Sequence, residues 1–416
     1  MNIVHLTYWG PDAKTGGAIS ARRLHFAMRK ANINSNVISA GHGDKHLHYE
    51  KLQNGRMTKF LESIFKEKIL EPIGLKGLYG PLPSRLKRHR SFIDSDIINI
   101  HRLFDFFSYL SLPWITREKP TIFTLCDMWG LTGHCYYSLD CEKWIHGCGR
   151  CPYLNISPQI RKDNTRLEWI LKKWAYQRSK ITIVTKSNWA TDIAKQSFLN
   201  IFPIYKIPNG IDTTIFKALD KKTCKSLIGI PKHKKAILFM AQNLNNFIKG
   251  GDHLLNILKS LPKSLRSELV IILLGEGMIK IPEELNIQTL KFGYVVNDYL
   301  KTLLYSAADV YLHPARAEVF GNTILESLAC GTPVVAFKVG GIPDLVQNGL
   351  TGYTAEYEDI ETFSEYLVRL MDDDSMRIKM GEISRSVVRK EYNLELWVER
   401  YLSLYKNTLE DTGKTN

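Results

Sequence analysis

The stretch Leu269-Val270-Ile271-Ile272-Leu273-Leu274 is apolar at every position and contains three β-branched side chains. This continuous pattern is typical of a strand in a parallel sheet, because helices cover such a strand on both faces. Similar short runs occur at 236–240, 290–292, 310–312 and 334–336, with room for a helix in most of the intervals. The second half of the chain is therefore predicted to form a doubly wound α/β domain.

The first half of the chain repeats this alternation. Ile3-Val4-His5-Leu6-Thr7 leads to Gly16-Gly17 and a helical pattern, and further strand-like runs lie at 37–39, 97–100, 121–125 and 181–185. With 416 residues the chain also exceeds the roughly 250–300 residues that one hydrophobic core supports. We predict two doubly wound, Rossmann-like α/β domains facing a cleft, 1–208 and 209–392, and a last helix within 393–416 that packs back on the first domain.

Composition narrows the class of protein. Apolar residues make up 44% and charged residues 24% of the chain, which is close to the average of globular proteins and argues against a disordered or fibrous chain. No run approaches the roughly 20 apolar residues that a membrane span needs, and the first residues lack the pattern of an export signal. We therefore expect a cytoplasmic protein, and the net charge of +14 predicts an anionic partner.

Much of this charge lies in one region, between residues 56 and 90. Apolar side chains such as Phe60, Phe65 and Ile69 alternate with the bases at helical spacing, which favours contact with an anionic membrane surface. A solvated basic helix with an ordinary core face explains the pattern equally well. The basic residues concerned are Arg56, Lys59, Lys66, Lys68, Lys76, Arg85, Lys87, Arg88 and Arg90.

A loop and a helix start follow the strand predicted at 310–312, and the sequence there reads Glu318-Val319-Phe320-Gly321-Asn322-Thr323-Ile324-Leu325-Glu326. Free amide groups and the dipole at a helix N-terminus attract anions, so Gly321, Asn322 and Thr323 are predicted to contact a diphosphate. Glu326 is placed to accept hydrogen bonds from a ribose, and Glu318 to meet hydroxyl groups of a sugar. A capped helix with two surface glutamates is the alternative.

Several motifs around this helix start form a larger pattern. Glu318 and Glu326, with Phe320-Gly321 between them, precede Ala329-Cys330-Gly331-Thr332-Pro333-Val334-Val335 and Gly340-Gly341-Ile342-Pro343-Asp344. This pattern resembles the donor-site signature of family-4 glycosyltransferases of the GT-B fold. The resemblance extends to Pro208-Asn209-Gly210-Ile211-Asp212, Lys249-Gly250 and Asn348-Gly349-Leu350-Thr351-Gly352. It implies transfer of a sugar from a nucleoside diphosphate, with retention at the anomeric carbon and without an obligatory metal ion.

The resemblance also implies roles for residues. Glu318 and Lys249 are expected to be catalytic, with Lys249 neutralising the departing diphosphate, since fixed cations aimed at developing charge are a strong catalytic device. Gly17, Asn243 and Phe320 are expected to contact the donor. Where the family carries an arginine, this chain reads Ala241-Gln242-Asn243-Leu244, so one cation is missing, and Arg316 is a candidate replacement. An ordinary turn at Gly17 and a surface lysine at 249 are the alternatives.

The segment Cys126-Asp127-Met128-Trp129-Gly130 is similar to one in the capsule and O-antigen branch of the family, in which a histidine precedes the aspartate. Cysteine is a weak hydrogen-bond donor and a poor substitute for imidazole. Cys126, Asp127, His101 and His134 are therefore all candidates for contact with the transferred sugar or the acceptor. Each histidine also fits a packed or surface role.

Four cysteines follow within a short stretch: Cys135, Cys141, Cys148 and Cys151. In a chain without an export signal, clustered thiols indicate a metal site more readily than disulfides. Structural zinc held by four thiolates is the prediction, and free thiols or disulfides are the alternatives. Four thiolates leave no open coordination position, so this zinc is not expected to be catalytic.

The sequence thus favours a transferase that moves a sugar from a nucleotide-sugar donor to a saccharide, lipid-linked, at the inner face of the plasma membrane in polysaccharide biosynthesis. Nucleic acid is not an expected partner, because the charge comes without a recognised binding motif. Three alternatives stay open: a nucleotide-sugar binding module without activity, a nucleic-acid-binding protein, and a phosphorylase or epimerase of the same architecture.

Overall fold

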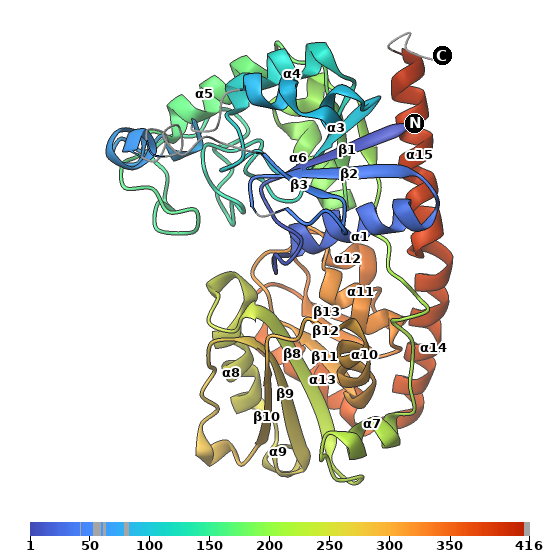
Figure 1. Cartoon of the computed structure of the whole chain (residues 1–416). Helices are drawn as coiled ribbons and strands as arrows, with labels where there is room; N and C mark the ends of the chain where they lie inside the picture. The colour runs from blue at the N-terminus through green and yellow to red at the C-terminus, as the bar shows by residue number, and fades with distance from the viewer. Residues whose placement is uncertain (42, 53–59, 61–63, 79–82, 412–416) are drawn as a thin grey trace. The chain divides into compact units, whose positions relative to one another are not determined.

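The computed structural model describes residues 1–41, 43–52, 60, 64–78 and 83–411 (Figure 1). The chain divides into two compact units: the first contains residues up to Pro208 together with those from Val398, and the second runs from Asn209 to Trp397. Each unit is built on a twisted sheet whose neighbouring strands pair in parallel. The predicted fold class of two Rossmann-like α/β domains is confirmed.

The first unit holds a seven-stranded sheet in the order β3-β2-β1-β4-β5-β6-β7. Its strands are β1 Asn2–Thr7, β2 Asn34–Ser39, β3 Tyr49–Lys51, β4 Ile97–Ile100, β5 Thr121–Thr124, β6 Thr182–Thr185 and β7 Ile204–Lys206. The α-helices described are α1 Gly16–Lys30, α3 Arg90–Ile93, α4 Leu112–Glu118, α5 Thr165–Tyr176 and α6 Asn188–Gln196. Shorter turns of helix are η1 Lys66–Leu70, η2 Lys76–Leu78, η3 Pro83–Arg88, η4 Tyr109–Ser111 and η5 Phe198–Ile201.

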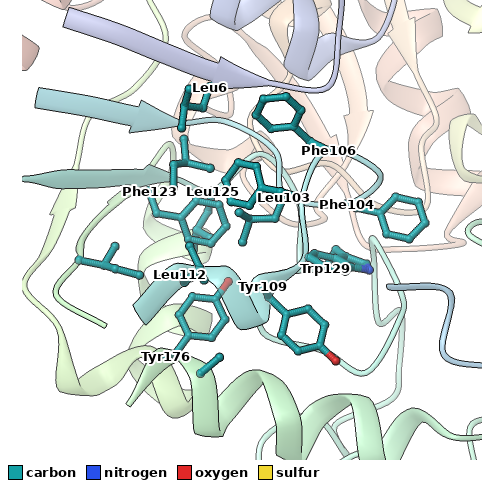
Figure 2. Close-up of a cluster of buried hydrophobic side chains, with 14 of the residues drawn as sticks. Leu6, Leu103, Phe104, Phe106, Tyr109, Leu112, Phe123, Leu125, Trp129 and Tyr176 are labelled. Carbon is teal, nitrogen blue, oxygen red and sulfur yellow. The ribbon is translucent and has the colours of Figure 1, made fainter. Parts of the chain in front are cut away.

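The core of the first unit is strongly aromatic. Phe123 on β5 and Tyr176 on α5 stack with ring centroids 6.1 Å apart, and Phe104 and Trp129 meet at 5.3 Å. Figure 2 shows these side chains, which come from a strand, a helix and two loops, gathered around one apolar cluster. The loops that follow β4 and β5 are thereby fixed by burial of their own side chains rather than by strand pairing.

The second unit holds a six-stranded sheet in the order β10-β9-β8-β11-β12-β13. Its strands are β8 Lys235–Asn243, β9 Leu269–Glu276, β10 Gln288–Gly293, β11 Val310–His313, β12 Val334–Phe337 and β13 Gly352–Ala355. Its helices are α7 Lys221–Leu227, α8 Gly251–Ser260, α9 Lys263–Glu268, α10 Asp298–Ala307, α11 Asn322–Ala329, α12 Ile342–Leu345, α13 Ile360–Asp372 and α14 Asp374–Glu391, with short turns η6 Phe247–Lys249 and η7 Glu283–Leu285. Two apolar clusters, one on each face, bury the sheet between helices.

The last helix, α15 Leu394–Asp411, belongs to both units. Its first turn, with Trp397, is counted in the second unit, and from Val398 onward it is part of the first. There the Tyr405 hydroxyl accepts a hydrogen bond from the buried Asn99 side chain at 2.8 Å, and the Tyr401 hydroxyl lies 3.2 Å from Thr124 Oγ1. These buried contacts are why the helix ends on the first unit.

Candidate functional site

Each sheet has one place where the strand order changes direction. In the second unit the connections lead outward from β8 to β10 on one side and from β11 to β13 on the other, and β1 and β4 mark the same place in the first unit. Loops leave the carboxyl ends of such a strand pair on opposite faces, which opens a crevice where α/β proteins bind their ligands. Lys249 and Glu318 follow β8 and β11 in sequence, and Gly17 and His101 follow β1 and β4.

Lys249 and Glu318 form the charged centre of the second unit's edge. Lys249, at the end of η6, places Nζ 2.6 Å from Glu318 Oε2, and His313 Nε2 lies 3.5 Å from the same oxygen. Burial by itself raises the pKa of Glu318, but the Lys249 ammonium and the His313 ring outweigh it and hold that pKa below its usual range. The structure therefore joins the two residues predicted to be catalytic as an ion pair with an ionised carboxylate.

Two glycines allow this pairing by letting backbone segments approach closely. Gly250 has φ +72°, and a Cβ there would lie 1.8 Å from the Pro314 carbonyl oxygen. Gly340 has φ +54°, and a Cβ there would lie 1.9 Å from the Glu318 carbonyl oxygen. Only glycine tolerates both the left-handed backbone and the contact. The Lys-Gly and Gly-Gly motifs thus hold the loop of Glu318 against the turn of Lys249.

The N-terminus of α11 follows this loop, as the sequence predicts. Gly321 caps the helix with φ +96°, and Asn322 and Thr323 are half-buried in its first turn. The Tyr311 hydroxyl donates to Thr323 Oγ1 at 2.8 Å, and the Asn209 side chain donates to Asn322 Oδ1 at 2.8 Å. The first turn is therefore held by side-chain contacts within its own unit.

Two predicted donor contacts are more deeply buried than their predicted roles suggest. Phe320 is 3% exposed and packs in the apolar cluster, with its ring 6.2 Å from that of Tyr392. Glu326 is 2% exposed, and its carboxylate accepts a hydrogen bond from Tyr305 at 3.2 Å. Phe320 is thus a core residue that supports the loop, while ribose contact by Glu326 stays a prediction.

The proposed replacement for the missing arginine is already engaged. Arg316 forms a two-pronged ion pair with Asp252, whose nearest contact is 2.5 Å, donates to the Phe247 carbonyl oxygen at 2.7 Å, and lies over the Phe247 ring. Asn243, at the carboxyl end of β8, accepts a hydrogen bond from the Asn245 amide at 2.9 Å. Arg316 thus has a structural partner, and Asn243 supplies no charge in place of the family's arginine.

In the first unit, several predicted residues meet at the carboxyl edge of the sheet. A Cβ on Gly17 would lie 3.4 Å from Cys126 Cβ, so the glycine loop and Cys126 are neighbours. His101 and Asp127 line one small cavity with Cys126. His101 Nε2 lies 2.9 Å from His5 Nδ1, and burial lowers the pKa of both rings. These histidines are therefore neutral near pH 7.

His134 and the four cysteines lie elsewhere, around a second small cavity. His134 Nε2 lies 3.3 Å from Cys151 Sγ, and Cys148 Sγ accepts a hydrogen bond from the Gly133 amide at 3.1 Å. All four thiols are free, and no three His, Cys, Asp or Glu side chains in the described residues are arranged to hold a metal ion. The thiols cluster as predicted, while zinc stays a prediction.

Sequence reasoning missed two residues at these edges. Lys186 directly follows β6 and is 4% exposed; its Nζ lies 3.1 Å from Ser20 Oγ and 3.5 Å from Cys126 Sγ. His313 ends β11 beside Glu318. A polar residue directly after a β-branched apolar run was the available signal, because the carboxyl ends of parallel strands form the ligand-binding edge.

In the basic region between residues 56 and 90, some of the apolar side chains are exposed and others are buried. Phe60, Phe65, Ile69 and Ile73 are exposed, whereas Leu70 is buried. Lys66, Lys76, Lys87 and Arg90 each form an ion pair with a carboxylate, which reduces the local positive charge. Arg56 and Lys59 lie outside the described residues. Within the part of the chain that the structure describes, no helix is long and apolar enough to span a bilayer.

Comparison with known proteins agrees with this geometry. Residues 14–215 match the family model "Glycosyltransferase Family 4" and residues 221–387 match "Glycosyl transferases group 1". N-acetyl-alpha-D-glucosaminyl L-malate synthase of Bacillus anthracis is 27% identical over 50% of this chain and 55% of its own length. The chain spans about half the length of most of the first curated relatives it matches.

Solved structures share the whole fold at low identity. Sucrose-phosphate synthase from Thermosynechococcus elongatus superposes with a TM-score of 0.72 and 17% identity over 99% of this chain and 100% of that one. HepE of Anabaena in complex with UDP superposes with a TM-score of 0.68 and 15% identity over 98% and 100%. These likenesses extend the fold assignment to both units.

Proposed function

We propose that this chain moves a sugar from a nucleoside-diphosphate sugar to a saccharide acceptor with retention at the anomeric carbon. The family matches and the similar GT-B structures support its assignment as a family-4 glycosyltransferase. The observation that carries the proposal is the Lys249–Glu318 ion pair at the carboxyl edge of the second sheet. This pair lies at the strand-order reversal, where α/β proteins bind ligands. Its cation suits the charged part of a nucleotide sugar, and its ionised carboxylate suits the hydroxylated part.

The two side chains fit different parts of such a donor. The diphosphate gains negative charge as its bond to the sugar breaks, and the Lys249 ammonium stabilises that charge. An ionised carboxylate is an acceptor only, so Glu318 suits sugar hydroxyl groups, which donate. The half-buried first turn of α11 supplies amide groups and the positive end of a helix dipole for the same phosphates. UDP bound to the HepE structure supports a nucleotide donor for this fold.

Substitution of the pair tests the proposal. We expect Glu318→Gln and Lys249→Met each to reduce release of nucleoside diphosphate from a panel of UDP- and GDP-sugars by on the order of 100-fold or more. Lys338→Met and Glu356→Gln are matched controls, because this lysine–glutamate pair, 2.8 Å apart, is exposed rather than buried. Unchanged turnover in both Lys249 and Glu318 variants would contradict the assignment, and the anomeric configuration of the product by NMR tests retention.

No metal ion is needed for the charge stabilisation that we propose, because a lysine and helix amides neutralise the phosphates. We therefore expect turnover to persist in excess EDTA. Loss of activity on chelation, restored by Mg²⁺ or Mn²⁺, would contradict this point. This test does not concern the cysteine cluster of the first unit. A structural metal ion there would dissociate slowly, and its loss would affect folding rather than the transfer step.

For the acceptor we propose a lipid-linked saccharide of cell-surface polysaccharide assembly, reached by peripheral binding at the cytoplasmic face of the membrane. Exposed Phe60, Phe65, Ile69 and Ile73 support this proposal, together with the net charge of +14. We expect salt-sensitive binding to anionic vesicles, weakened in Phe65→Ser with Ile69→Ser, and no comparable retention on duplex DNA. Retention on DNA alone would favour a nucleic-acid partner instead.

A binding module without turnover is the second candidate function. The engagement of Arg316 with Asp252 favours it, because the missing family arginine then has no replacement at the phosphates. This candidate predicts that nucleoside diphosphates raise the thermal midpoint while no sugar nucleotide is consumed. Turnover by the wild-type chain with any acceptor excludes it.

A further inference from the structure

The first unit contains a pocket that none of the predicted site residues explains. Its volume is about 640 Å³, which lies within the range of small-molecule sites, roughly 300–1,000 Å³. Four stretches of chain line it: residues 71–76, which lead from η1 into η2, the loop after β4, Tyr136 in the loop after β5, and residues 154–161, which follow the cysteines. The two small cavities described above, one beside Cys126 and one among the four cysteines, are much smaller.

The walls of this pocket are fixed to one another. Gly74 has φ +72°, and a Cβ there would lie 1.9 Å from the Lys162 carbonyl oxygen, so the turn after η1 touches the chain just beyond residues 154–161. The Asn164 side chain also donates to the Ile73 carbonyl oxygen. His134 Nδ1 lies 3.0 Å from the Pro158 carbonyl oxygen and holds the far wall. A pocket with walls tied at these points is largely preformed.

The lining has the chemistry of a sugar site. Phe104 and Tyr136 meet edge to face with centroids 6.0 Å apart, and Arg102 donates to the Tyr136 hydroxyl at 2.6 Å. Around these rings lie the polar side chains of Asn155, Ser157 and Gln159, of which Gln159 already donates its amide to the Asn155 carbonyl oxygen at 2.8 Å. Aromatic rings pack on the C–H faces of sugars, while amides and hydroxyls both donate to and accept from sugar hydroxyls.

The charge of the lining residues and the surface around the pocket limit the class of ligand further. The carboxylates of Glu71 and Asp105 balance the cations of Lys76 and Arg161 in the lining, and Lys76 is 3.4 Å from Glu71. This balance does not favour a strongly anionic ligand such as a free nucleoside diphosphate, and the polar lining does not suit an acyl chain. Ile73, on the same turn as Glu71 and Lys76, is exposed, so an apolar surface adjoins the pocket.

We propose that this pocket binds the saccharide part of the acceptor. The proposal rests on the transferase function proposed above and adds to it the side chains that select an uncharged, hydroxyl-rich acceptor. The partly exposed Tyr136 ring, which packs on the buried Phe104, contacts the sugar ring, and the side chains of Asn155 and Arg161, with the carbonyl oxygen of the Gln159 side chain, hydrogen-bond the sugar's hydroxyl groups. The adjoining apolar turn suits a saccharide that is attached to a lipid.

Two variants test the pocket without entering the protein core. Ser157 and Arg161 are both exposed, so Ser157→Trp fills the pocket and Arg161→Ala removes a donor without a buried cavity. Ser226→Trp and Arg178→Ala are matched controls at exposed positions outside the lining. The probe is a printed array of neutral and acidic oligosaccharides, followed by titration of the saccharide that the wild type retains best.

We expect the wild type to retain neutral saccharides, Ser157→Trp to weaken the best one at least about tenfold, and Arg161→Ala to weaken it less. The thermal shift given by UDP or GDP should stay the same in all four variants. Equal saccharide affinity in Ser157→Trp and wild type, or a wild type that shifts with nucleotide yet retains no neutral saccharide, overturns the pocket assignment. Absence of any nucleotide shift in the wild type instead counts against the proposed function itself.

Discussion

The two units contain the same kind of sheet, but the loops that follow the carboxyl ends of their strands differ. In the second unit the loop from β11 to α11 is short, and glycines press it against the neighbouring turn of Lys249. In the first unit residues 125–164 run from β5 to α5 without a helix or strand. When a loop is short, the residues of a sequence motif lie close together, so the motif predicts their contact. A long irregular segment is positioned by burial, hydrogen bonds and close approaches, and a motif does not encode these.

The largest effect is expected from the second unit's glycine contact. Gly250→Val adds a branched side chain where a Cβ already lies 1.8 Å from the Pro314 oxygen. We expect a loss of at least about 2 kcal/mol in the free energy of unfolding, measured with urea, and loss of donor turnover. Gly229→Val is the control, because Gly229 has φ +75° but no atom within 4 Å of its Cβ position. Equal costs at the two sites would show that contact is unimportant.

The long segment of the first unit gives the next effect. If the clustered thiols bind structural zinc, the wild type purified under reducing conditions contains stoichiometric zinc by mass spectrometry, and Cys148→Ser loses the zinc and unfolds at lower temperature. Cys224→Ser, a buried cysteine of the second unit, should keep the zinc. A wild type without zinc, with all four thiols reactive after unfolding, would show that burial alone holds this segment.

A smaller effect is expected at Lys186, where the first unit places a buried cation beside Cys126. We expect Lys186→Met to lower turnover on the order of tenfold and to leave nucleotide affinity unchanged, because it removes a fixed cation at the strand-end edge. Lys206→Met, on the exposed strand β7, is the control. A variant that only unfolds more easily, with turnover per folded molecule intact, would assign Lys186 to stability alone.

The smallest effect concerns the pH dependence of stability. The pKa of Glu318 lies below its ordinary value of 4.5 in the folded chain, so its ion pair contributes stability that is complete above pH 4.5 and decreases as the pH falls toward the folded value. We expect the unfolding free energy of the wild type, relative to Glu318→Gln, to drop by about 1 kcal/mol between pH 5 and 3.5. A difference that stays constant over this range would contradict the ion pair.

Prediction from sequence succeeded where residues repeat a physical pattern. Continuous apolar runs predicted most of the strands. Three strands were missed because they are short and contain polar or small residues: β3 Tyr49–Lys51, β7 Ile204–Lys206 and β13 Gly352–Ala355. The roles expected of Lys249 and Glu318 came from motif resemblance, but their ion pair was not predicted, because no periodicity links positions so far apart. The core role of Phe320 was missed because the same motif fits either a ligand contact or a buried support.

In the first unit the sequence predicted residue types but not their neighbours. Cys126, His101 and His134 were considered together, yet His134 lines the cavity of the cysteines and His101 pairs with His5. The pocket beside Gly74 was invisible in the sequence, because four separate stretches form it and its glycine contact is purely steric. Such long-range packing depends on which loop surfaces match, and local patterns do not report that.

The helix α15 has a consequence for how this chain is made. Asn99 and Thr124 are buried in the first unit, and their hydroxyl partners Tyr405 and Tyr401 lie 306 and 277 residues later in the chain. The half that emerges first therefore cannot complete its interior until α15 has been synthesised, and an isolated fragment of residues 1–208 should bind chaperones or aggregate. Folding of the two units is coupled through α15, although each unit has its own sheet.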